Sequence, residues 1–207
     1  MSPHRAALRA TVRPQRGRKD NHLPPPLGEG DRRTAVEGAC RVLEEARLWL
    51  GTPYRHQAST LGAGCDCLGL IRGVWRGLYG DEPEAPPPYR PDWAEIGVGE
   101  PLLAAFGRWL LAIPVSQAQP GDVLVFRMAP DAAAKHCAIQ SAPDRIIHAY
   151  WGRACVESAL GRWWRERCVA AFRFPIPKTP DLPGESQGPD RTHGLAGCGA
   201  GVWREHI

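Results

Sequence analysis

The segment Gly64-Cys65-Asp66-Cys67-Leu68-Gly69-Leu70-Ile71 sets the organisation of the chain. It leads from a short glycine-rich approach into apolar residues spaced by three and four positions. These residues are Leu68, Ile71, Trp75 and Leu78. The spacing predicts a helix with one apolar face. Asp66 is a preferred N-cap residue, so we expect Cys67 in the first turn of that helix.

A thiol in the first turn of a helix has an unusual environment. Unpaired backbone N–H groups and the positive end of the helix dipole favour an anion there. The pKa of such a cysteine can fall from about 8.5 into the range of about 3.5–7.5, which makes it a nucleophilic thiolate near neutral pH. The alternative is a buried cysteine that packs as a small hydrophobic side chain.

The composition is that of a globular protein with one domain. Of 207 residues, 43% are hydrophobic and 23% are charged, which suffices for a packed core. The net charge of +4 is uneven, because six basic residues and no acidic residue precede Asp20. This asymmetry would suit a nucleic acid or an anionic surface, but the stretch lacks a regular aromatic or helical pattern. We therefore predict a solvated leader and no nucleic-acid partner.

Cysteine usage and hydropathy bear on where the chain is made. The seven cysteines are odd in number and scattered, unlike the dense, even sets of small disulfide-stabilised secreted domains. The basic leader is not followed by the apolar run of a signal peptide, and no segment reaches the length of a membrane span. These features predict reduced thiols, synthesis in the cytoplasm without a signal peptide, and no membrane span.

Proline, glycine and charge divide the chain into three parts. Residues 1–33 are predicted to be a disordered basic, proline-rich leader, and residues 176–207 a disordered tail. The folded domain is predicted at 34–175. Its first helix would begin with a capping box of Thr34 and Glu37 and end at Gly51. Its apolar face would hold Val36, Ala39, Leu43, Ala46 and Leu50.

Helices come first and strands afterwards. The Cys67 helix would end at Gly80, a proline-stiffened loop would span 81–93, and Pro101 would open another helix. The inner side of that helix would hold Leu102, Leu103, Phe106, Leu110 and Ile113. Strands are predicted at 123–126, 136–140, 145–150, 154–157 and 169–174, joined by short turns that imply antiparallel neighbours. The order predicts an α+β fold, with N-terminal helices packed on a central antiparallel sheet.

Two histidines follow Cys67 in the predicted sheet. His136 begins one strand and His148 lies in the next, on either side of an Ala142–Asp144 turn. A hairpin about this turn would place the two histidines opposite one another on one face, with Cβ atoms about 4.5–5.5 Å apart. One imidazole could then take the proton of Cys67 while the other fixes its tautomer. The pattern favours nucleophilic catalysis by Cys67, His136 and His148, without a metal or a cofactor.

Other interpretations of the same residues remain open at the level of sequence. Cys65 and Cys67 could bind zinc with the two histidines, although the Cys-x-Cys spacing is tighter than usual and no His-x₃₋₅-His pair follows. Tyr54 could be a core aromatic residue, or it could direct its hydroxyl at a developing oxyanion. The pair 163–164, two tryptophans among arginines, could stack on sugar rings or lie across the edge of the core.

The combined pattern resembles the NlpC/P60 cysteine peptidases. The resemblance rests on four segments in order: Gly51-Thr52-Pro53-Tyr54, Asp66-Cys67-Leu68-Gly69-Leu70, Gly121-Asp122-Val123-Leu124-Val125-Phe126, and His136 with Ile147-His148-Ala149. It covers roughly residues 35–175 and is closer to phage cell-wall peptidases encoded beside tail genes in prophages and gene transfer agents. It implies a papain-like fold. Leu68 departs from the family, which usually has serine there, and leaves the substrate preference open.

The resemblance also implies roles for individual residues. Cys67 would be the nucleophile, His136 the general base and His148 the residue that orients it. Tyr54 would assist the oxyanion, and Asp66 would cap the helix or bind a substrate amine.

A cysteine endopeptidase or amidase acting on peptidoglycan stem peptides through a thioester is therefore expected. It would work in the periplasm or cell wall as part of a virion-like tail, beside other phage-tail proteins. The alternatives are a non-catalytic tail-tip assembly subunit and a thiol-dependent acyltransferase.

Overall fold

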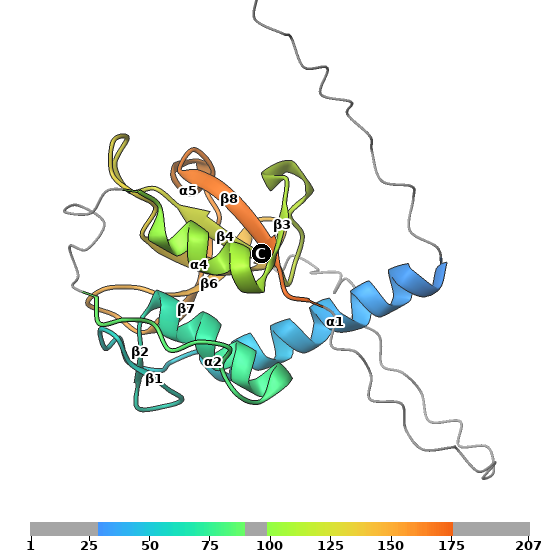
Figure 1. Ribbon diagram of the computed structural model, residues 1–207, viewed down its shortest axis with the longest axis horizontal. Helices are drawn as coiled ribbons and strands as arrows, with labels where there is room; N and C mark the ends of the chain where they lie inside the picture. The colour runs from blue at the N-terminus through green and yellow to red at the C-terminus, as the bar shows by residue number, and fades with distance from the viewer. Residues whose placement is uncertain (1–28, 90–98, 176–207) are drawn as a thin grey trace, which may run out of the picture.

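The computed structural model describes residues 29–89 and 99–175 (Figure 1). The predicted leader up to residue 28, the predicted tail, and the last residues of the predicted 81–93 loop lie outside this part. The helices are α1 (Glu29–Leu48), α2 (Cys67–Tyr79), α4 (Pro101–Trp109), the 3₁₀ turn η1 (Val115–Gln117) and α5 (Arg162–Arg165). The strands are β1 (Ser59–Thr60), β2 (Gly64–Cys65), β3 (Leu111–Ile113), β4 (Val123–Phe126), β5 (His136–Ala142), β6 (Arg145–Ala149), β7 (Cys155–Ala159) and β8 (Cys168–Arg173).

Six strands form one antiparallel sheet in the order β3-β8-β4-β5-β6-β7. The prediction of an α+β fold with an antiparallel sheet is confirmed. Successive strands from β4 to β7 are neighbours, as the short turns predicted. β8 instead returns to lie between β3 and β4, so the last strand of the described ranges is inside the sheet.

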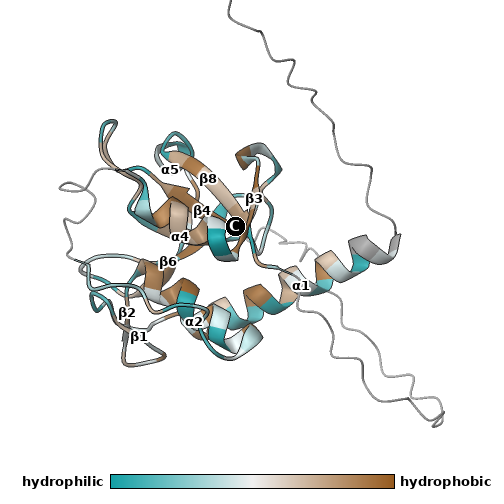
Figure 2. Ribbon diagram, viewed as in Figure 1, coloured by the Kyte–Doolittle hydropathy of each residue, from teal (hydrophilic) through white to brown (hydrophobic). Residues whose placement is uncertain are grey.

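The two faces of the sheet carry separate cores. The larger core joins α1, α2 and α4 to inward-facing strand residues such as Val125, Ile139 and Ile147. The smaller core, which includes Phe126 and Ile146, lies on the other face under α5. Figure 2 shows the hydrophobic residues concentrated on the strands, whereas α1 alternates between hydrophilic and hydrophobic. All four residues of β4 are buried, because each faces one of the two cores.

The first helix differs from its prediction in its start and in its buried face. It begins at Glu29, so the predicted capping box at Thr34 is wrong and residues 29–33 are helical. Inside the helix the Thr34 hydroxyl donates to the Gly30 carbonyl 2.9 Å away. The N-terminal end of α1 extends past the sheet (Figure 1), which leaves Val36 61% exposed. The buried residues are Val42, Leu43, Ala46 and Trp49, and Leu50 is exposed.

The third predicted helix ends four residues early. α4 has Pro101 in its first turn and buries Leu102 and Phe106, as predicted. It stops at Trp109, and Ile113 lies in the short strand β3, which the sequence analysis missed. The helical spacing of Ile113 was coincidental, because β3 is held by pairing with the distant β8.

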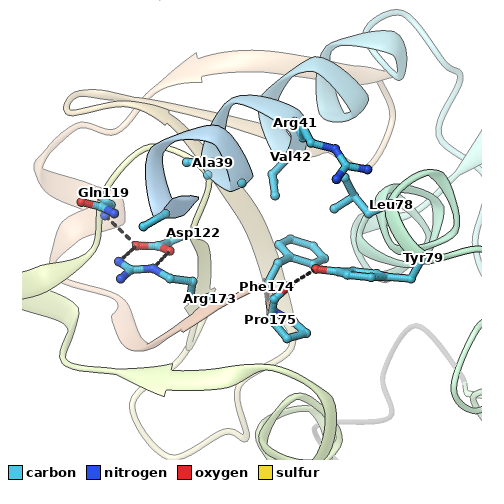
Figure 3. Close-up of a pocket in the computed structure, with 13 residues that line it drawn as sticks. Ala39, Arg41, Val42, Leu78, Tyr79, Gln119, Asp122, Arg173, Phe174 and Pro175 are labelled. Carbon is cyan, nitrogen blue, oxygen red and sulfur yellow. Dashed lines mark hydrogen bonds and ion pairs between the residues drawn. The ribbon is translucent and has the colours of Figure 1, made fainter. Parts of the chain in front are cut away.

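The end of β8 is fixed to the start of β4 by a charged pair (Figure 3). The Arg173 guanidinium donates from Nε and Nη2 to the two oxygens of Asp122, each at 2.8 Å. Asp122 is buried and also accepts from the Gln119 backbone N–H. Gly121 precedes it at φ 96°, and a Cβ there would lie 3.0 Å from Ala39 of α1. This turn therefore needs glycine for its conformation and for the close approach of α1.

No helix in the described ranges 29–89 and 99–175 is long and apolar enough to cross a membrane.

Candidate active site

Cys67 is the first residue of α2, and Asp66 caps this helix as predicted. Asp66 has extended backbone angles, and its Oδ1 accepts from the Gly69 N–H at 2.8 Å. Cys67 therefore lies in the first turn, at the positive end of the helix dipole, where an anion is favoured. Its Sγ lies 3.8 Å from the carbonyl oxygen of Lys135, the residue before β5.

The Asp66 carboxylate also holds the loops around the cysteine. Its Oδ2 accepts from the Gln57 N–H at 2.7 Å and from the Tyr89 hydroxyl at 2.6 Å. Burial and the nearby Cys67 charge raise the pKa of Asp66, against the hydrogen bonds that it accepts. Both oxygens are thus engaged by groups of this chain. The structure supports the capping role, and a substrate amine would have to displace Tyr89 to reach Asp66.

His136 and His148 form a hydrogen-bonded pair at the end of the sheet nearest Cys67. His136 Nε2 lies 2.9 Å from His148 Nδ1. The predicted register is wrong by two residues: Ile139 pairs with Ile147, which places His148 opposite Ala138 and makes the two histidines diagonal neighbours. The reason is the centre of the turn: the paired strands turn about Pro143, whereas placing the two histidines directly opposite one another requires a turn about Ala142. A shift of two residues keeps both side chains on the same face, so the predicted juxtaposition survives.

The surroundings of Cys67 stabilise its thiolate. The thiol of Cys137 donates a hydrogen bond to it, and His136 adds a hydrogen bond and a favourable charge. Together these lower the pKa of Cys67 well below its usual value, although burial acts in the opposite direction. The pKa of Cys137 is raised by its burial and by the Cys67 charge. Cys137 therefore stays protonated and serves as the donor.

His148 is the buried partner of the pair. It is 2% exposed, and burial together with the His136 charge lowers the pKa of its imidazole to about 3. It is consequently neutral at physiological pH. Its Nε2 lies 3.0 Å from the hydroxyl of Ser158 on β7.

Trp164 covers the outer side of both histidines. Its ring stacks on His136 with centroids 5.2 Å apart and an interplanar angle of 28°, and it meets His148 edge-on. It packs at the edge of the smaller core, whereas Trp163 is 45% exposed, with Arg167 4.1 Å above its ring. Of the two interpretations of the tryptophan pair at 163–164, a position across the edge of the core is the one that fits Trp164. Ser158, Cys137 and the contact of Trp164 with His136 were not predicted from the sequence.

Tyr54 lies in the segment between α1 and β1. It forms a β-bridge with Cys65 and its ring lies against Trp151, with centroids 5.4 Å apart. Burial and the nearby Cys67 charge raise the pKa of its phenol to about 12. The hydroxyl is therefore protonated and able to donate a hydrogen bond near Cys67.

A cleft of about 320 Å³ opens beside Cys67. One wall is the proline-rich loop with Pro86, Pro87 and Tyr89, and the other is α4 with Leu102 and Ala105. Its lining is mostly apolar, with Leu68 next to the cysteine and an ion pair between Glu84 and Arg108 at its rim. The cleft is large enough for part of a peptide, with Cys67 in its wall.

The loop that leads into His136 is held by Glu100, the residue before α4. Glu100 accepts from the Ala134 N–H at 2.8 Å and pairs with Arg127, whose guanidinium also donates to the Ala132 carbonyl at 2.6 Å. The start of β5 is thus tied to the start of α4. This arrangement fixes His136 relative to the cleft wall.

Within the two described ranges, no three His, Cys, Asp or Glu side chains converge as a metal site would require. Cys65 and Cys67 have different partners: the sulfur of Cys65 is hydrogen-bonded to Cys155, and that of Cys67 to Cys137. The arrangement of Cys67, His136 and His148 is instead the kind that activates a sulfur nucleophile.

A model of the NlpC/P60 family matches residues 51–173, which include Tyr54, Asp66, Cys67 and both histidines. The chain belongs to the NlpC/P60 family. This confirms the predicted family and its fold. The match begins at the turn after α1 and ends at the last residue of β8, so the NlpC/P60 domain includes the whole sheet.

Individual relatives agree with this family. The chain is 28% identical over 167 residues to gamma-DL-glutamyl hydrolase of Bacillus subtilis (strain 168), across 76% of this chain and 36% of that protein. It thus spans about a third of that relative. Solved structures similar to it include the NlpC/p60 domain of the peptidoglycan hydrolase SagA (23% identity, TM-score 0.46, 66% of this chain and 98% of that one). Another is an NlpC/P60 family protein from Bacillus cereus ATCC 10987 (20% identity, TM-score 0.48, 67% and 40%).

Proposed function

We propose that this NlpC/P60 protein is a cysteine peptidase that hydrolyses amide bonds in peptidoglycan stem peptides. The observation that carries the proposal is the placement of Cys67 at the start of α2, next to His136, whose other ring nitrogen lies 2.9 Å from His148. The lowered pKa of Cys67 supports a thiolate paired with a protonated His136. Family membership and the hydrolase from Bacillus subtilis support the substrate class.

In the first half of the proposed reaction, the Cys67 thiolate attacks the carbonyl carbon of the amide. The carbonyl oxygen becomes an oxyanion, which the Cys67 backbone N–H and the Tyr54 hydroxyl stabilise. One such donor is worth about 3–4 kcal/mol in comparable enzymes. His136 gives its proton to the leaving amine, the C–N bond breaks, and a thioester on Cys67 remains.

In the second half, water replaces the amine. His136, now neutral, takes a proton from the water, whose oxygen attacks the thioester carbonyl. Collapse of the second tetrahedral intermediate breaks the C–S bond and releases the carboxylic acid. The proton on His136 again balances the negative charge of the free Cys67 thiolate.

The test is hydrolysis of defined muropeptides, followed by the mass of the products. Cys67→Ala should abolish cleavage, because no other group replaces the sulfur nucleophile. Cys40→Ala, which removes a thiol from α1, is the matched control and should cleave at the wild-type rate. Hydrolysis by Cys67→Ala as fast as by the wild type would refute the mechanism.

The same experiment separates the alternatives. Release of a free carboxylic acid indicates hydrolysis, whereas transfer of the acyl group to an added amine would identify an acyltransferase. We propose the bond between γ-linked D-glutamate and a diamino acid as the bond cut, by analogy with the family and with the name of the Bacillus relative. Muropeptides with and without this linkage test that choice.

We further propose that the protein acts in the periplasm or cell wall as part of a phage-like tail, together with other tail proteins. The support is the order of its sequence motifs, which resembles tail-associated peptidases. Alkylation of Cys67 distinguishes a catalytic from an assembly role there. It should stop wall cleavage and leave particles intact, whereas a pure assembly subunit would have no cleavage to lose.

A further inference from the structure

His148 has a hydrogen-bond partner on each of its two ring nitrogens. Nδ1 lies 2.9 Å from His136 Nε2, and Nε2 lies 3.0 Å from Ser158 Oγ. Ser158 belongs to β7, where it pairs with Ile146, while His148 pairs with Val156. Ser158 is therefore the diagonal neighbour of His148 on the same face of the sheet. The three side chains form a continuous row across β5, β6 and β7.

The protonation states of the two imidazoles decide which group donates each hydrogen bond in this row. His148 is buried and neutral, so its ring carries one N–H. When His136 is protonated it must donate its Nε2–H to an acceptor, and His148 Nδ1 is in place to accept it. The single proton of His148 is then on Nε2, which requires an acceptor in turn. Ser158 Oγ is that acceptor.

We propose that Ser158 is a positioning residue that selects the tautomer of His148 required by the charged form of His136. Without it, His148 can carry its proton on Nδ1 and donate to His136 Nε2. His136 would then keep its own proton on Nδ1, directed at Cys67, and could not accept the proton of the thiol. The catalytic consequence rests on the proposed hydrolase function, but the effect on the Cys67 thiolate does not.

The surroundings set the expected size of the effect. His148 is also faced by Tyr150 and Trp164, and a hollow of about 210 Å³ beside it is lined by Arg153, Trp163 and Ser158. Water in this hollow can partly replace a lost hydroxyl, so removal of Ser158 Oγ should weaken the arrangement without abolishing it.

The titratable groups that interact with Cys67 are unchanged by a substitution at position 158. They are His136, Cys137, Asp66, Tyr54, Cys65 and Tyr89. A change in the titration of Cys67 would therefore have to come through His136.

The experiment compares Ser158→Ala, Ser158→Thr and Ser141→Ala in the full-length chain. Ser141 is the matched control because it lies on β5 of the same sheet and its buried hydroxyl has no hydrogen-bond partner within the described ranges. The first measurement is the rate of Cys67 alkylation by iodoacetamide as a function of pH, followed by mass spectrometry of the Cys67 peptide. The second is kcat/KM for muropeptide hydrolysis.

Ser158→Ala should raise the pKa of Cys67 by about half to one unit and lower kcat/KM about 3- to 15-fold, mainly through kcat, the range expected for one hydrogen bond. Ser158→Thr keeps the hydroxyl and should restore both, and Ser141→Ala should match the wild type.

An alkylation profile of Ser158→Ala equal to that of Ser141→Ala would overturn the proposal. So would a shift that Ser158→Thr does not reverse, because it would indicate a merely structural effect. A shifted profile in a protein that cleaves no muropeptide would support the positioning role and refute only the proposed hydrolase function.

Discussion

The two histidines of the site differ in how deeply they are buried. His136 is partly exposed, whereas His148 is buried and neutral. This division gives the two imidazoles different tasks, since only a neutral ring offers an acceptor to its neighbour. The same burial makes His148 a source of acid sensitivity for the whole fold.

We predict that His148 makes the protein less stable as the pH falls below about 6.5. The pKa of its imidazole is about 3 in the folded state and about 6.5 in the unfolded chain. Because the folded pKa is the lower one, the unfolded state binds the proton first. The stabilisation is complete above about pH 6.5 and is lost progressively as the pH falls towards 3.

The measurement is urea unfolding of the wild type and His148→Gln at several pH values. Between about pH 7 and pH 5 the wild type should lose about 2 kcal/mol more of its unfolding free energy than the variant. Parallel losses in the two proteins would show that His148 is not protonated on unfolding.

Single residues with local causes could be predicted from the sequence. Asp66 caps α2 because its side chain reaches an N–H three residues ahead, and this places Cys67 in the first turn. Ser158, Cys137 and Trp164 could not be predicted in the same way, because their roles depend on which strands are neighbours. For example, Ser158 on β7 is linked to His136 on β5 only because β6 pairs with both of these strands.

At the scale of elements, α2 carries two glycines one turn apart on the side that faces α1, and their neighbours differ. A Cβ on Gly73 would lie 1.8 Å from Cζ2 of Trp49, a buried side chain directly after α1 that packs against α2. A Cβ on Gly77 would meet only the end of the Glu45 side chain. The first glycine permits the helices to approach closely, whereas the second has no such requirement.

Gly73→Ala and Gly77→Ala should therefore have opposite effects. Alanine favours a helix over glycine by up to about 1 kcal/mol, so Gly77→Ala should stabilise the protein by up to that amount. Gly73→Ala has the same propensity gain, but it displaces Trp49 and should destabilise the protein by about 1–3 kcal/mol. Urea unfolding of both variants tests the contrast. Equal effects of the two substitutions would contradict the proposed packing of α1 on α2.

Elements with a strong local pattern were predicted well, and those defined by a distant partner were not. The strands β4 to β8 were found from their composition and turns, and α2 and α4 from their apolar spacing and first-turn residues. β3 has three residues and no pattern of its own, so only its pairing with β8 makes it a strand. The N-terminal part of α1 was missed because helix capping signals occur inside helices as well as at their ends.

At the scale of the whole molecule, the fold depends on returning β8 to the middle of the sheet. No local pattern specifies this position. The pair of Asp122 and Arg173, which are 51 residues apart, joins the start of β4 to the end of β8 directly beside α1 (Figure 3). Its aspartate side chain is 2% exposed and its arginine 31%.

We predict that this pair contributes to global stability and not to the chemistry of the site. Asp122→Asn would place an amide N–H₂ group against the Arg173 guanidinium and the Gln119 N–H, which leaves a partly buried cation without its partner. The unfolding free energy should fall by about 2–4 kcal/mol, somewhat less than for a fully buried pair because Arg173 is partly exposed.

The matched control is Glu37→Gln, which breaks an exposed ion pair with Arg33 on α1. It should change the unfolding free energy by no more than about 0.5 kcal/mol. At a temperature where both variants are folded, the pH profile of Cys67 alkylation should equal that of the wild type in each. If Asp122→Asn were as stable as Glu37→Gln, β8 would have to be held in place by its pairing with β3 and β4 and by apolar packing of Phe172 and Phe174 in the larger core, without a contribution from the ion pair.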